Sequence, residues 1–138
     1  MHEETLKKWL SQVRKGSLEL CILGLIKSKE TYAFEIVQEL EKIDGLVLAE
    51  GTMYPLLKRL QSDNLITSYW CESDSGPPRK YYKITDNGIG LLDEMMREWF
   101  QFTGFINNIL ERSKESGRTE NNDTRQNKQI HLEVRAKS

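Results

Sequence analysis

The sequence predicts a mainly α-helical protein with one small two-stranded β-hairpin placed before its last helix. Three segments repeat apolar residues at helical spacing, over residues 6–27, 31–45 and 52–64. A stretch rich in β-forming residues follows at residues 66–84 and is interrupted by a strong turn signal. The longest helical pattern then runs to about residue 110. This order of elements is that of a winged helix-turn-helix domain followed by a long C-terminal helix.

The first two helical segments each have an apolar face. Between residues 6 and 27 apolar side chains recur at steps of three and four, and Gly16 is a weak point that could divide the helix in two. Thr31 is the expected N-cap of the second helix and Gly45 its C-cap, because these residue types suit those positions. The second segment repeats apolar residues at i, i+3, i+4 and i+7: Ala33, Ile36, Val37 and Leu40.

The third helix is expected to begin near Thr52. Pro55 sets this start, because a proline is tolerated only in the first turn, where its missing N–H has no partner to lose. Asp63 and Asn64 close the helix. One face is apolar and is expected to be buried: Met53, Leu56, Leu57 and Leu60. The other side carries groups that can donate to phosphates and base edges: Tyr54, Lys58, Arg59 and Ser62.

The hairpin is expected to have strands over residues 66–71 and 79–84, joined by a turn over residues 73–78. Its return strand carries three basic side chains, those of Arg79, Lys80 and Lys83. Basic residues outnumber acidic residues from the third helix through the hairpin, whereas acidic residues dominate the second helix. This segregation indicates a local basic face.

The last helix carries the clearest seam in the chain. Apolar residues recur at alternating steps of three and four for about three heptads, the pattern of a helix that packs against another helix. A small domain cannot bury this much apolar surface from one helix. We therefore expect a second copy of the chain to cover it. The residues expected at this dimer interface are Leu92, Met96, Trp99, Ile106 and Leu110.

Composition excludes several classes of protein. With 20 basic and 21 acidic residues in 138, the chain is not a polycation that coats nucleic acid indiscriminately. Cys21 and Cys71 are too isolated for a zinc site, and no apolar run approaches the roughly 20 residues of a membrane span. His2 and His131, the two histidines, lie near the ends, and no catalytic fingerprint is present. We expect a cytoplasmic protein that is neither an enzyme nor a membrane protein and needs no cofactor or metal.

Four stretches of the chain resemble the PadR family of bacterial transcriptional regulators. They are Gly16–Leu25, Tyr32–Ile36, Gly51–Leu60 and Gly76–Thr85. The last two are the most specific, and the likeness extends over roughly residues 14–110. A short chain with a single C-terminal helix is similar to the multidrug-sensing subfamily.

The resemblance implies a homodimeric repressor that binds a palindromic operator near its own gene or near a transporter or stress gene. Residues 1–85 would be the DNA-binding domain and residues 86–112 the dimerisation helix. From its polar composition, the tail over residues 113–138 is expected to be disordered or a fraying extension of that helix. Where family members place a phosphate-binding tyrosine, this chain has Phe34, and Tyr32 could substitute for it. The expected DNA contacts are Tyr32, Thr52, Tyr54, Lys58, Arg59, Gly76, Arg79 and Lys80.

The resemblance also implies an effector site, since multidrug-sensing members stack flat ligands on a tryptophan of the C-terminal helix. Trp99 matches that position, and Met96 and Trp9 could complete a pocket for a planar hydrophobic compound. The alternative is that Trp99 only packs the dimer seam. For the whole chain, the alternative function is a winged helix that binds another protein and no operator, which the near-neutral net charge permits.

Overall fold

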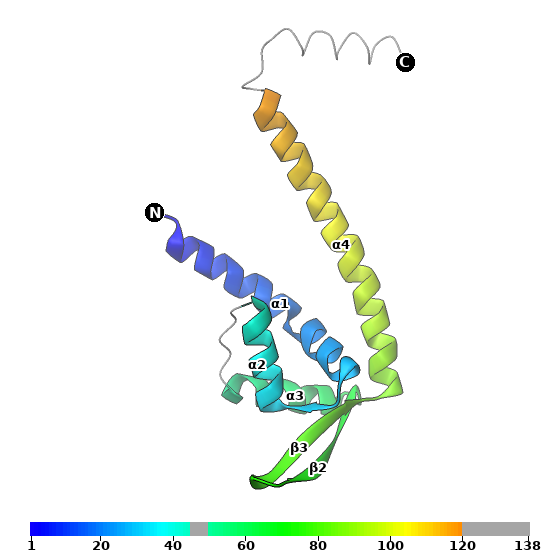
Figure 1. Cartoon of the computed structure of the whole chain (residues 1–138). Helices are drawn as coiled ribbons and strands as arrows, with labels where there is room; N and C mark the ends of the chain where they lie inside the picture. Colours follow the sequence, from blue (N-terminus) through cyan, green and yellow to red (C-terminus); the bar gives the residue numbers. More distant parts are fainter. Residues whose placement is uncertain (45–49, 120–138) are drawn as a thin grey trace. The chain divides into compact units, whose positions relative to one another are not determined.

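The computed structural model describes residues 1–44 and 50–119 and divides into two compact units, Met1–Met96 and Arg97–Ser138. Its elements, drawn in Figure 1, are α1 (Glu3–Ser28), β1 (Thr31–Tyr32), α2 (Ala33–Asp44), α3 (Glu50–Ser62), β2 (Ile66–Ser73), β3 (Gly76–Ile84) and α4 (Asp86–Thr119). The predicted fold class is confirmed: the chain is mainly helical, with a β-wing after the third helix and a long final helix.

The sheet has three strands in the order β1-β3-β2, so the predicted two-stranded wing is incomplete. The third strand comes from Thr31 and Tyr32, which pair antiparallel with Tyr82 and Tyr81. Thr31 was expected to cap the second helix, and that prediction is wrong. Its backbone joins the sheet, and its buried hydroxyl donates to the Glu35 carboxylate at 2.8 Å. The pairing of β1 is possible because β3, which lies far along the chain, leaves the edge opposite β2 open to a further strand.

Three element boundaries also differ from the sequence prediction. α1 runs through Gly16 without a break. α3 begins at Glu50 rather than at Thr52, and Pro55 therefore lies inside the helix. The hairpin tip is tighter than expected, because Ser73 pairs with Gly76 and the strands take in most of the predicted turn. The predicted C-cap Gly45 lies outside the described residues.

A Schellman-type cap ends α3 and directs the chain into the wing. Asn64 adopts a left-handed backbone conformation, φ 59°. The Asn64 N–H donates to the Gln61 carbonyl at 3.1 Å, and the Leu65 N–H donates to the Leu60 carbonyl at 3.0 Å. Leu60 and Leu65 are both buried, which adds the apolar contact that usually accompanies this cap.

The start of α4 is fastened to the same turn. Thr85 Oγ1 accepts from the Gly88 N–H at 2.9 Å and donates to the Asn64 carbonyl at 2.7 Å, while the Thr85 N–H donates to the Leu65 carbonyl. Gly88 lies so close to that segment that an added Cβ would collide with the Leu65 carbonyl oxygen. The first turn of α4, the end of α3 and the start of the wing are therefore one tightly packed junction.

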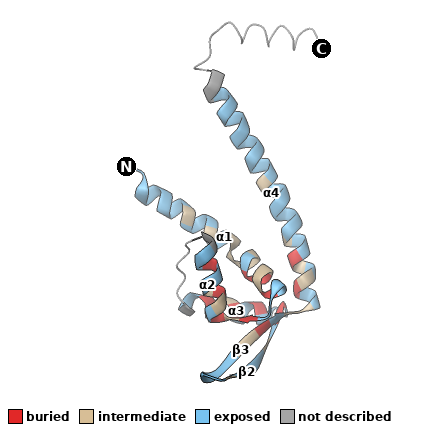
Figure 2. Ribbon diagram, in the orientation of Figure 1, coloured by how far each residue is buried: buried red, intermediate tan, exposed pale blue. Residues whose placement is uncertain are grey.

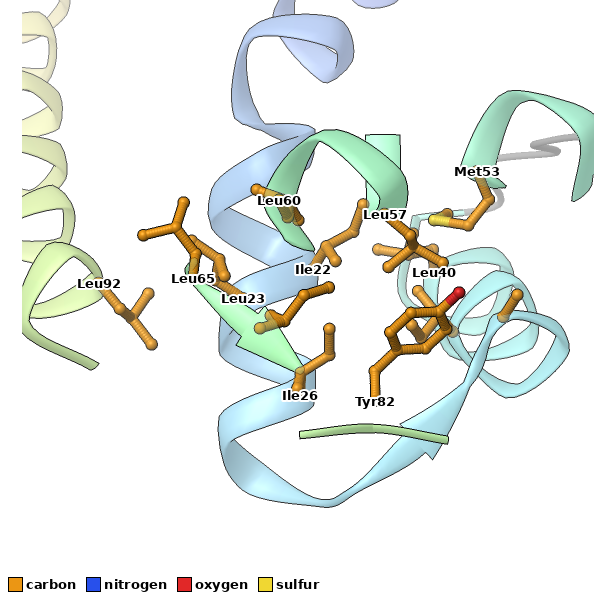
Figure 3. Packing of buried hydrophobic residues seen from close by; sticks show 13 residues of the cluster. Ile22, Leu23, Ile26, Leu40, Met53, Leu57, Leu60, Leu65, Tyr82 and Leu92 are labelled. Atoms are coloured by element: carbon orange, nitrogen blue, oxygen red, sulfur yellow. The ribbon is translucent and has the colours of Figure 1, made fainter. Parts of the chain in front are cut away.

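One hydrophobic core holds the first unit together (Figure 3). Its largest fully buried side chains come from α1, α2, α3 and β2, and Figure 2 shows that burial is concentrated where these elements meet. Tyr82 of β3 and Leu92 of α4 complete the core. Leu92 was expected at a dimer seam, but it is only 2% exposed within a single chain and has little surface to offer a partner. Its place in the heptad pattern reflects packing inside the domain.

Candidate nucleic-acid interface

The outward face of α3 and one face of the wing enclose an open hollow of about 490 Å³. From α3 come Tyr54 and Lys58, both exposed, and from β3 comes Lys80. The remaining lining residues are Gln61, Ser62 and Tyr82. The set includes two ammonium groups, two phenols, an amide and a hydroxyl, and none of these residues is acidic. Such a lining offers hydrogen-bond donors and positive charge to an anionic ligand.

The wing face that borders this hollow is held by contacts with α3. Gln61 Nε2 donates to Ser68 Oγ of β2 at 3.0 Å. The Lys80 ammonium lies 5.9 Å from the centre of the Tyr82 ring, a cation–π contact that restricts a long side chain. Burial of that ring raises the pKa of Tyr82. The wing is therefore docked on α3 through its base.

The opposite face of the wing carries a cluster of aromatic and charged residues. The Tyr81 ring lies against those of Tyr32 and Tyr69, with ring centres 5.3 and 5.8 Å away, and the Arg79 guanidinium lies 4.7 Å above the Tyr32 ring. Tyr69 donates to the Glu30 carboxylate at 2.7 Å, which raises the pKa of Tyr69 to about 12. Glu30 thus ties the turn after α1 to the outer strand of the wing.

The predicted DNA contacts are consequently not one cluster. Tyr54, Lys58 and Lys80 lie together in the hollow, whereas Arg79 and Tyr32 lie together on the other face of the wing. Arg59 belongs to neither group, because it pairs with Glu19 of α1 at 3.1 Å. Two further predicted DNA contacts are exposed but belong to neither group. They are Thr52 in the first turn of α3 and Gly76 at the wing tip.

Sequence reasoning missed Gln61 and Glu30. Gln61 carried a signal that could have been used, since it falls three residues after Lys58 on the same helical face. Glu30 carried none, because its partners Tyr69 and Lys83 come from distant strands.

The residues predicted for dimerisation and effector binding are mostly exposed. Met96 and Trp99 are 39% and 37% exposed, and Trp9 of α1 is 57% exposed. Trp9 and Met96 belong to the first compact unit and Trp99 to the second. Beyond Met96, α4 carries further exposed apolar side chains: Phe100, Phe102, Phe105, Ile106, Ile109 and Leu110. The helix continues past residue 112, the predicted end, to Thr119; the rest of the predicted tail lies outside the described residues.

The family model of the PadR-like transcriptional regulators matches residues 22–94, from the second half of α1 through the wing to the first turns of α4. The chain belongs to the PadR family. Members of this family are transcriptional regulators and not enzymes. The matched segment contains the hollow, the wing and the core described above.

Individual PadR relatives agree with this assignment. A PadR-like regulator from Bacillus cereus has a solved structure with 41% identity and a TM-score of 0.67, covering 72% of this chain and 96% of its own. A transcriptional regulator of Mycobacterium tuberculosis is 31% identical over 64% of this chain and 80% of its own length. Bacillus subtilis PadR, solved with operator DNA, is 26% identical with a TM-score of 0.53, covering 57% of this chain and 45% of its own.

No helix among the described residues of this PadR-family chain is both long and apolar enough to cross a membrane.

Proposed function

We propose that this PadR-family chain is a homodimeric repressor that binds a palindromic operator near its own gene or near a transporter or stress gene. The observation that carries the proposal is the acid-free hollow between α3 and the wing, lined by Lys58, Lys80 and Tyr54. Bacillus subtilis PadR has been solved with operator DNA, which supports the same use of the fold here. The proposed place of action is the cytoplasm.

In the proposed complex α3 enters the major groove and the wing follows the adjacent backbone. In this proposal the exposed side chains of Tyr54 and Lys58 reach base edges and Lys80 neutralises a phosphate, which the shared hollow of the three residues supports. The acidic second helix would face away, because like charges on DNA and protein repel. Arg59 is not part of this contact set, since Glu19 already neutralises it.

The dimer is proposed to form through the exposed apolar side chains of α4. Phe102, Phe105 and Ile109 are each at least 60% exposed, and soluble monomers rarely leave so many large apolar side chains together in water. A two-fold axis would present two α3 helices to half-sites one helical turn, roughly 34 Å, apart. The palindromic form of the operator follows from that symmetry.

Release by a small molecule is part of the proposal. Trp99 offers an exposed aromatic face, and a planar hydrophobic compound is proposed to stack on it. Binding there would favour one spacing of the two DNA-binding heads over the other, and operator affinity would change by the coupling energy, typically about 1–3 kcal/mol. In the competing interpretation, Trp99 binds no ligand and only packs in the dimer seam of α4.

The test is a gel shift on the DNA upstream of the protein's own gene, with and without planar hydrophobic compounds. Lys58→Ala is expected to weaken binding by roughly tenfold, because it removes a base or phosphate contact worth about 1–3 kcal/mol. Lys42→Ala is the matched control, since Lys42 is an exposed lysine of α2 paired with Glu39. Equal losses for the two variants would show that α3 does not face the duplex.

The near-neutral net charge of −1 keeps a second candidate in view, a winged helix that binds another protein. Salt dependence separates the two functions. A DNA-binding dimer with several phosphate contacts should lose affinity steeply between low and moderate salt. A protein-interaction module should show no retention on duplex DNA at any salt concentration.

A further inference from the structure

Trp70 of β2 is 69% exposed, more than any other aromatic residue of the described part of the chain. Exposing an indole ring to water is unfavourable, and a tryptophan is a common anchor where a protein surface binds a partner. Trp70 lies in the wing, remote in sequence from the apolar seam of α4. The dimer contact proposed above does not account for it.

The strand register places Trp70 on the face of the wing that borders the hollow. Trp70 is directly opposite Lys80, and Ser68 is directly opposite Tyr82. Opposite residues of an antiparallel pair project from the same face, as do residues two apart on one strand. Lys80 and Tyr82 line the hollow, and Ser68 contacts Gln61 of α3. The only irregularity of the pair lies beyond Cys71, so it does not alter this placement.

The neighbours of Trp70 indicate what kind of partner it meets. Its cross-strand partner is the cation Lys80, and its neighbour on the same face toward the start of β2 is the polar Ser68. Glu72, two residues in the other direction, lies at the irregularity of the strand pair. A surface built to bind an apolar protein patch would continue into further apolar side chains, as α4 does. An aromatic ring beside an ammonium group instead suits a sugar–phosphate chain, which has an apolar deoxyribose next to an anionic phosphate.

We propose that Trp70 is a DNA-contact residue of the wing. Its ring packs on a deoxyribose of the strand that borders the groove entered by α3, and its indole N–H donates to a phosphate oxygen. Lys80 neutralises a phosphate next to it. This inference rests on the proposed operator binding and extends it, because it assigns an anchoring role to a residue outside the basic set.

The experiment measures the affinity of the full chain for a fluorescently labelled duplex from the region upstream of its gene, at several salt concentrations. Trp70→Ala is expected to bind about tenfold more weakly with an unchanged slope of affinity against salt, because no phosphate charge is uncovered. Lys80→Ala is expected to lower that slope by about one unit per subunit. Thr67→Ala is the matched control and should bind like the parent, because Thr67 lies on the opposite face of the same strand, across from Lys83, which pairs with Glu30.

A second readout separates a contact from a folding effect. With Trp9 and Trp99 changed to Phe, Trp70 is the one remaining indole, and duplex DNA should shield it from acrylamide quenching. Trp70→Phe, which keeps a ring in place, should recover part of the affinity lost in Trp70→Ala.

The outcomes separate this inference from the function on which it rests. If the parent binds duplex DNA and Trp70→Ala binds equally well, the role of Trp70 is refuted and operator binding stands. If the parent retains no duplex at any salt concentration, the proposed function itself fails. If Trp70→Ala changes the sedimentation of the free protein instead of its DNA affinity, Trp70 contacts a second copy, and the inference is overturned.

Discussion

At the scale of single residues, the Tyr69–Glu30 hydrogen bond couples the wing to the end of α1. The phenol donates to a carboxylate at 2.7 Å, and losing the proton would place two anions side by side. The hydrogen bond to Glu30, followed by desolvation and by repulsion from the Glu30 charge, raises the pKa of Tyr69 from 10.0 to about 12. The folded state therefore holds the proton more tightly than the unfolded chain does. The stabilisation is complete below pH 10 and is lost as the pH rises through 12.

Tyr69→Phe should therefore flatten the alkaline part of the stability curve. The parent is expected to lose thermal stability between pH 10 and 12 more steeply than the variant, as measured by circular dichroism melting at fixed ionic strength. Subtracting the two curves removes the contribution of the other tyrosines and of the lysines. Parallel curves through this window would mean that the hydrogen bond is not maintained in solution.

Gly88 is required by packing rather than by backbone conformation. A Cβ there would collide with the Leu65 carbonyl oxygen and crowd the Ile84 side chain. Gly88→Ala is expected to destabilise the chain by about 1–3 kcal/mol, the usual cost of overpacking, in a urea titration. Gly90→Ala is the matched control, because its Cβ meets no atom within 4 Å, and it should be neutral or stabilising by up to about 1 kcal/mol. Equal changes in the free energy of unfolding for the two variants would mean that the junction around Gly88 accommodates the added methyl group without strain.

At the scale of elements, the two faces of the wing carry different basic groups. One face joins α3 in the hollow through Lys80, and the other carries Arg79 over the Tyr32 ring. The ring restricts the guanidinium without neutralising it, so Arg79 remains available to a phosphate. A wing that straddles a backbone strand would use both faces.

Arg79→Ala is expected to lower the salt slope of operator binding by about one unit per subunit, as measured by affinity at several salt concentrations. Tyr32 should remain in place in this variant, because β1 is held by its backbone pairing with β3. A slope identical to that of the parent would exclude this face of the wing from the complex.

At the scale of the whole molecule, the proposed dimer would cover the exposed apolar side chains of α4. Leu92 belongs to the core, so the seam open to a second copy is the later part of the pattern, with Ile106 and Leu110 among its members. Ile106→Glu places a charge on that seam without touching the core. It is expected to shift the sedimentation of the chain from dimer to monomer and to weaken operator binding, since each head would then bind alone.

A control for that variant is Glu111→Gln, a change of charge at an exposed position of the same helix, where a salt bridge to Lys114 is the only described contact altered. It should sediment like the parent. A parent chain that is already a well-folded monomer at micromolar concentration would remove the dimer from the model, and with it the palindromic operator.

The sequence by itself determined the elements and their order, because periodicity and turn chemistry are local. The apolar repeats of the second and third helices predicted core residues, and most of these are buried, while Val37 and Leu56 are only partly buried. The outward position of Tyr54 and Lys58 followed from the same repeat. Pro55 misplaced the predicted start of α3, because the helix begins five residues before the proline and includes it.

Only the tertiary structure decided which of these residues meet. Whether Thr31 caps a helix or extends a sheet depends on β3, which lies some fifty residues further along the chain. In the same way, distant segments decide that Arg59 pairs with Glu19 and that Leu92 is buried in the core. They also decide that Glu30 contacts both Tyr69 and Lys83. Local sequence sets the conformation of each segment, but pairing between distant segments depends on how their surfaces pack, and no local pattern encodes that.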